Sequence, residues 1–199
     1  MCRIKNKKPP REMMCGGWSY KCDFELKEDL PRCEKRVFRR ALGRKNKLYG
    51  SLMLLGKEDV GDRNYLFLGG KKDGSGLNII KICRARRAKP SVVEEKPLSI
   101  GNIRAKSDSA DALIGAGIST EALTRAVIPS GALDAFSRAA GKSEGAGIEP
   151  VCYLASQVVA GVNHAFLCVI ANGDTRSLAV VVVYADLSGG ARITDIKEI

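Results

Sequence analysis

An internal repeat restricts the fold of this chain more than any other feature of its sequence. The heptapeptide Val-Phe-Arg-Arg-Ala-Leu-Gly at residues 37–43 corresponds to Ala-Phe-Ser-Arg-Ala-Ala-Gly at residues 135–141, which lies 98 positions later. Three further matches follow in the same order, at shifts of 93 to 100 positions: Gly61 with Gly161, Phe67-Leu68 with Phe166-Leu167, and residues 100–103 with residues 193–196. Matches at a nearly constant shift indicate a tandem duplication, so both halves are expected to repeat one plan.

Each half contains one segment with an apolar stripe at helical spacing. In the first half the stripe consists of Leu30, Cys33, Val37, Phe38, Ala41 and Leu42. Asp29 and Pro31 predict the start of this helix, and Gly43 predicts its end. In the second half, Pro129 and Ser130 predict a helix start, and the stripe consists of Leu133, Phe136 and Ala140.

Short apolar runs that are rich in β-branched residues predict strands around each helix. In the first half these runs are residues 20–26, 48–55, 64–68, 77–83 and 98–103, and residues 84–97 form a basic loop. In the second half they are 151–155, 165–170, 178–184 and 192–196, with a first strand inside 114–127. The order predicts an α+β fold of two tandem units, each with one helix packed on a four- to five-stranded antiparallel sheet.

The domain boundaries follow from this repeat and from the charge. We place a basic tail at residues 1–12, one unit at 13–105 and a second at 106–199. Residues 1–106 carry 27 Lys+Arg and 12 Asp+Glu, whereas residues 107–199 carry 6 and 10, so the net charge of +11 comes from the first half. A basic half favours an anionic partner, which is a nucleic acid, a membrane or an acidic protein surface.

Composition argues against an enzyme and against a bound metal or cofactor. Seven cysteines without a regular spacing and a single histidine do not form a zinc motif. Gly69-Gly70-Lys71-Lys72 lacks the spacing of a phosphate-binding loop, and no residue stands out as catalytic. Because residues 1–12 contain no apolar segment, we expect a cytoplasmic protein, or a secreted one if a leader has been removed.

The residues that we single out for function form an apolar turn. Gln157, Val158, Val159, Ala160 and Gly161 lie between two strand-like runs, and Gly161 and Asn163 tolerate turn conformations. The simplest interpretation is a hairpin with Val158, Val159 and Ala160 at its tip. An apolar tip that is exposed to water suggests a binding surface.

Gln-Val-Val-Ala-Gly resembles the first inhibitory hairpin of the cystatins, which are reversible inhibitors of papain-like cysteine proteases. The upstream Met-Cys-Gly-Gly at residues 14–17 looks like the N-terminus of a stefin, the leaderless and disulfide-free branch of that family. The resemblance implies that three adjacent pieces fill the protease cleft: the N-terminal Gly16 and Gly17, the first tip, and a second hairpin turn. In this chain the second turn is Leu187, Ser188, Gly189 and Gly190, where family members often have Pro-Trp.

The same resemblance leaves other functions open. The corresponding turn of the first half reads Lys57, Glu58, Asp59, Val60 and Gly61, and its two carboxylates would have to lose water to enter an apolar cleft. We therefore expect no inhibition from that turn. Residues 157–161 could instead be the end of a buried strand, and the chain could be a non-inhibitory module that binds a protein or an anionic surface. Hairpins of this family also exchange between chains, which would give a domain-swapped homodimer.

Overall fold

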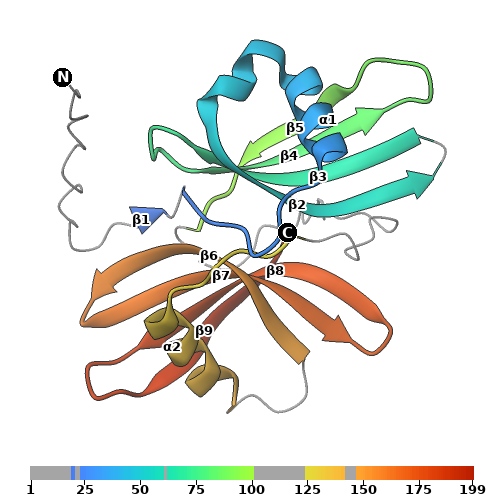
Figure 1. Cartoon of the computed structure of the whole chain (residues 1–199). Helices are drawn as coiled ribbons and strands as arrows, with labels where there is room; N and C mark the ends of the chain where they lie inside the picture. The colour runs from blue at the N-terminus through green and yellow to red at the C-terminus, as the bar shows by residue number, and fades with distance from the viewer. Residues whose placement is uncertain (1–18, 21–22, 61, 101–123, 142–146) are drawn as a thin grey trace, which may run out of the picture.

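The computed structural model describes residues 19–20, 23–60, 62–100, 124–141 and 147–199. Two antiparallel β-sheets face each other, and a short α-helix lies against the outer surface of each (Figure 1). The first sheet has the order β2-β3-β4-β5, and the second has the order β1-β6-β7-β8-β9. The arrangement is therefore a β-sandwich with two helical additions.

The four-stranded sheet is built from consecutive strands. They are β2 (Tyr49–Val60), β3 (Asp62–Lys71), β4 (Leu77–Arg84) and β5 (Ser91–Pro97). The helix α1 (Arg32–Leu42) and the 3-10 helix η1 (Gly43–Leu48) precede them. Gly43 ends α1 with a positive φ of 57° and a ψ of −123°, a conformation that a residue without Cβ adopts at little cost.

The five-stranded sheet also consists mainly of consecutive strands. They are β1 (Ser19–Tyr20), β6 (Gly147–Val159), β7 (Gly161–Asn172), β8 (Thr175–Ala185) and β9 (Ala191–Glu198). The helix α2 (Ser130–Ala140) precedes β6. Its buried side chains are Ala132, Ala135, Phe136 and Ala139, while Leu133, which we placed on the apolar face, is exposed.

The largest apolar cluster lies between the two sheets. Leu66 and Leu68 of β3 belong to the same cluster as Leu167 of β7 and Val180 of β8. The strands β3, β7 and β8 each contain an unbroken run of buried residues, because alternate side chains point to opposite faces and both faces are covered. Full burial of each such aliphatic side chain contributes about 1.5–3 kcal/mol, so this layer joins the two halves into one core.

The outer faces carry smaller clusters that include the helices. The Phe38 ring of α1 meets the Phe67 ring of β3 edge to face, with centroids 5.3 Å apart. The Phe136 ring of α2 meets the Phe166 ring of β7 in the same way, at 5.1 Å. The two ring pairs agree with the internal repeat, because each helix uses the equivalent phenylalanine to contact the equivalent strand of its own half.

The two halves exchange their N-terminal segments. β1 comes from the first half, but Ser19 pairs with Ser156 and Tyr20 pairs with Ala155, both in β6. In the opposite direction, the Thr124 backbone amide donates to the Leu54 carbonyl of β2 at 2.9 Å. The halves are therefore linked by backbone hydrogen bonds as well as by the shared core.

The predicted fold class is wrong. In two separate α+β units, the main apolar core of each unit would lie between its helix and its own sheet. Instead, strands dominate the described residues, and the main apolar layer lies between the two sheets. Of the strand predicted at residues 20–26, only Tyr20 lies in β1, which joins the other half's sheet, and residues 23–26 form no strand beyond an isolated bridge between Leu26 and Ala126. Ser91–Pro97, predicted as part of a loop, is the strand β5. The boundary that we placed between the two units, after residue 105, lies outside the described residues.

None of the helices in the described part of the chain is both long enough and apolar enough to span a membrane.

Candidate functional site

Two hairpin turns lie beside each other at one end of the five-stranded sheet. The turn between β6 and β7 follows Val159, and the turn between β8 and β9 follows Ala185. The register pairs Val162 of β7 with Ala185 of β8, and Ala185 in turn pairs with Ala191 of β9. The two turns that we predicted as the first and second tips are therefore neighbours.

The first tip is a tight turn that exposes apolar side chains. Val159 pairs with Gly161 across the turn, which leaves Ala160 at the apex. The Val159 side chain is 42% exposed, and Ala160 is also exposed, whereas Gln157 and Val158 are half-buried. The predicted hairpin is confirmed, with Val159 and Ala160 exposed at its tip. Val158, which we also placed at the tip, instead lies in β6, where it pairs with Val162 and is half-buried. The alternative that residues 157–161 only end a buried strand does not describe Val159 or Ala160.

Polar contacts hold this tip in one conformation. The Tyr184 hydroxyl of β8 donates a hydrogen bond to the Ala160 carbonyl at the apex. The Asn163 side-chain amide donates to Gln157 Oε1 at 2.8 Å, across the base of the turn. The Arg192 guanidinium lies over the Tyr184 ring, 4.8 Å from its centroid. A tip that is tied to the neighbouring strand loses little conformational entropy when it binds a partner.

Glycine is required at position 161. Its φ of 130° is a backbone conformation that other residues rarely adopt. A Cβ atom at this position would also lie 2.9 Å from the Tyr184 ring and would clash with the Ala185 carbonyl. The close approach of β7 to β8 at the turn therefore depends on the absence of a side chain.

The second tip is organised by Asp186, which the sequence analysis did not single out. Asp186 Oδ1 accepts hydrogen bonds from the backbone amides of Ser188 and Gly190, both at 2.8 Å. Gly189 has a φ of 87°. This turn leaves Leu187 88% exposed. An Asp followed by Ser and glycines is a turn signal that could have identified it.

The N-terminal glycines fall outside the described residues, but the strand that follows them does not. Ser19 of β1 begins two positions after Gly17 in the sequence and pairs with Ser156. Ser156 directly precedes Gln157. The chain therefore enters the sheet on the strand that carries the first tip.

Burial shifts the pKa values of several titratable groups near the tip. The Tyr153 hydroxyl lies 3.0 Å from His164 Nδ1, and burial lowers the pKa of His164 and raises that of Tyr153. Cys152 and Cys168 are buried and lie outside any disulfide, and burial raises the pKa of Cys168 far above its usual range. Within the described ranges, no group of three or more His, Cys, Asp or Glu side chains is placed to hold a metal ion.

The site is thus a pair of hydrogen-bonded turns, each with an exposed apolar side chain, beside the entry of β1. Comparison of the chain with protein-family models, with curated proteins and with solved structures found no match.

Proposed function

We propose that this chain is a reversible, non-covalent inhibitor of papain-like cysteine proteases that occludes the active-site cleft with the β6–β7 tip. The observation that supports this proposal is the gathering of three segments at one end of one sheet. The first tip exposes Val159, the second tip exposes Leu187, and β1 enters beside Gln157. The resemblance implies the same three pieces for a cystatin.

The physical basis is burial of apolar surface by a rigid wedge. Removing apolar surface from water stabilises a complex by about 25 cal/mol per Å². Much of that gain is lost when loops must be ordered on binding. The hydrogen bond from Tyr184 to Ala160 and the bond between Asn163 and Gln157 keep the first tip ordered in the free protein.

One departure from the resemblance predicts weaker binding. The second tip presents Leu187 where cystatins often present Pro-Trp, so it buries less apolar surface in a cleft. We therefore expect the first tip to supply most of the affinity.

The experiment is a titration of papain activity with the full chain and with two matched variants. Val159→Asp places a carboxylate on the first tip, where an apolar cleft would have to remove its water. Val93→Asp makes the same change on β5, where the side chain is 60% exposed. An unpaired buried charge costs several kcal/mol, and each 1.4 kcal/mol corresponds to about tenfold in affinity. Val159→Asp is expected to weaken inhibition at least about tenfold, and Val93→Asp is expected to leave it unchanged.

Two results would contradict the proposal. One is the absence of papain inhibition by the unmodified chain at any concentration up to its solubility. The other is an equal effect of the two variants. Thermal unfolding of both variants would check that each one is folded.

A further inference from the structure

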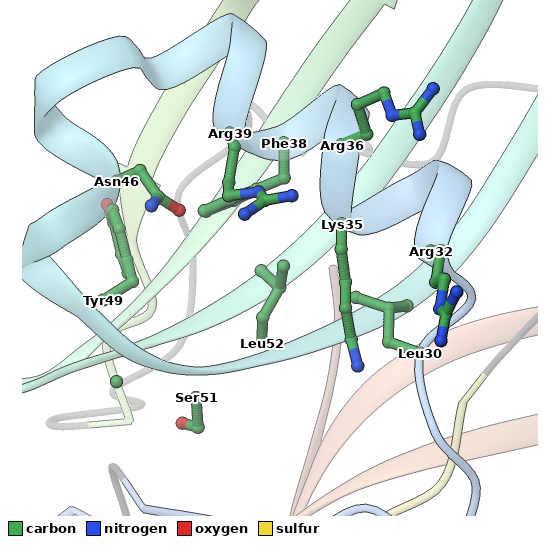
Figure 2. A pocket seen from close by; sticks show the side chains of 11 residues that line it. Leu30, Arg32, Lys35, Arg36, Phe38, Arg39, Asn46, Tyr49, Ser51 and Leu52 are labelled. Carbon is green, nitrogen blue, oxygen red and sulfur yellow. The ribbon is translucent and has the colours of Figure 1, made fainter.

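A second candidate site lies on the other sheet, in a groove between α1 and the edge strand β2. The groove has a volume of about 540 Å³, which is the size of a small-molecule site. Its walls come from α1, η1 and the first residues of β2 (Figure 2). Nothing in the protease proposal uses this surface.

Four cationic side chains of one helix line this groove. They are Arg32, Lys35, Arg36 and Arg39. All four are exposed, and Figure 2 shows Lys35 and Arg39 extending from α1 toward Leu52 of β2. Residues three and four apart are neighbours on a helix, so this row places like charges side by side, which destabilises an isolated helix.

Little negative charge offsets this row. Of these four cations, only Lys35 has an acidic partner among the described residues, and that partner is the exposed Asp29 at 3.9 Å. An exposed ion pair at this distance contributes little. The buried Glu34 points its carboxylate to Lys57 instead. Within the part of the chain that the structure describes, the positive charge of the groove is thus little compensated, and an anion bound in it would relieve the repulsion along α1.

We propose that this groove binds a ligand with clustered phosphate groups, carried either by a free organic phosphate or by a lipid headgroup. Guanidinium groups match the geometry of phosphate oxygens with two parallel N–H donors, and three of the four cations are arginines. The amide of Asn46 and the hydroxyl of Ser51 add neutral polar groups to the wall.

The rest of the groove argues for a compact anion rather than a long alkyl chain. Leu30, Phe38 and Tyr49 line it, but all three are almost fully buried, so they offer little free apolar area. Leu52 is half-buried, and apart from Gly50 the exposed residues of the wall are the four cations of α1. Binding would thus depend on charge and on guanidinium geometry.

The test compares two double variants that remove the same charge from α1 and η1. Lys35→Gln with Arg39→Gln removes two cations that line the groove. Arg40→Gln with Arg44→Gln removes two exposed cations that do not line it. The probes are tripolyphosphate and ATP, measured by calorimetry at fixed salt. A parallel arm uses phosphatidylcholine vesicles with and without phosphatidylinositol bisphosphate, and a single-stranded oligonucleotide serves as the macromolecular comparison.

We expect one-to-one binding that the groove variant weakens by about tenfold or more and that the control variant leaves within about twofold. Retention on the phosphoinositide vesicles with the same dependence would identify a headgroup as the source, and binding of the soluble probes alone would identify a free phosphate. Equal losses in the two variants would overturn the proposal, because the interaction would then follow net charge. Saturable binding of the oligonucleotide alone, or of no probe, would also overturn it. Equal melting temperatures of the two variants would show that both are folded.

Discussion

The hairpins β2–β3 and β6–β7 share a backbone arrangement but differ in the chemistry of their tips. Each hairpin has an asparagine near its turn whose side-chain amide donates a hydrogen bond to the opposite strand. Asn64 donates to Glu58 at 2.9 Å, and Asn163 donates to Gln157 at 2.8 Å. Both hairpins also have a register shift at the same place, between Leu54 and Gly56 and between Tyr153 and Ala155. In these hairpins, each residue of the first half therefore corresponds to the residue 99 positions later in the second half.

The strand register shows that Gly161 does not correspond to Gly61, the match that we drew from the sequence. Val60 pairs with Asp62 in the first hairpin, as Val159 pairs with Gly161 in the second. The counterpart of Gly161 is thus Asp62, one position after Gly61. The first hairpin therefore carries Glu58, Asp59 and Asp62 where the second carries Gln157, Val158 and Gly161. The comparison teaches that a duplicated scaffold can keep its hydrogen bonds while a few apex residues decide what the tip can contact.

The largest effect is expected from the layer that joins the two halves. Leu66→Ala removes a fully buried side chain from that layer, and a substitution of this kind costs about 2–5 kcal/mol. Because both sheets share this layer, the backbone amides of β3 and β7 should lose their protection from hydrogen exchange at the same urea concentration. The exposed Val93→Ala should change stability by less than about 0.5 kcal/mol. Two separate unfolding transitions, of which Leu66→Ala shifts only the midpoint of the first sheet, would mean that the halves unfold independently.

A smaller effect is expected at Gly161, the glycine that distinguishes the β6–β7 tip from the β2–β3 tip. Gly161→Ala combines backbone strain with a clash against β8, and we expect it to destabilise the protein by about 1–3 kcal/mol. Gly173→Ala is the matched control, because Gly173 also has a positive φ, of 58°, but has open space around it. Its cost should be near the lower end of that range. Denaturant midpoints would measure both, and a larger cost at Gly173 would contradict the role that we give to the close approach of β7 and β8.

The smallest effect concerns a carboxylate that only the first half contains. Glu34 is buried in α1, and its counterpart in α2 is Ala132. Burial raises the pKa of Glu34, but hydrogen bonds from Cys33 and Lys57 outweigh it, so the pKa lies below the ordinary value of 4.5. A lowered pKa in the folded state stabilises the fold above pH 4.5, and this contribution is lost as the pH falls through the folded value.

Denaturant midpoints at neutral pH and below pH 4.5 would measure this contribution. Glu34→Gln should reduce the difference between the two midpoints, because the variant lacks the titrating group. The exposed Glu25→Gln serves as the control and should leave the difference as it is. An unchanged difference in Glu34→Gln would show that this ion pair contributes nothing to acid stability.

Much of the local structure was predictable because its signals act over a few residues. Gly43 ended α1 as expected, and Val37 and Phe38 marked its buried face. The turn residues predicted both tips. Other elements were missed for physical reasons. Ser91–Pro97 is an edge strand whose polar side chains face water, so its composition resembles a loop. We placed Cys33 on the apolar face of α1, but Cys33 is exposed and the neighbouring Glu34 is buried. The carboxylate of Glu34 pairs with Lys57, which lies 23 residues away, so no local pattern indicates its burial.

By itself, the sequence determined the repeat, the two helices, most of the strands and the apolar tip, since each of these depends on propensity, spacing or turn chemistry within a short segment. Only the tertiary structure decided that the sheets share one core, that the halves exchange their N-terminal segments, and that β1 lies beside the first tip. The unbroken apolar runs in β7 and β8 require cover on both faces. Any apolar surface of suitable shape satisfies that requirement, so the partner of each face is chosen by packing across the whole molecule rather than by local pattern.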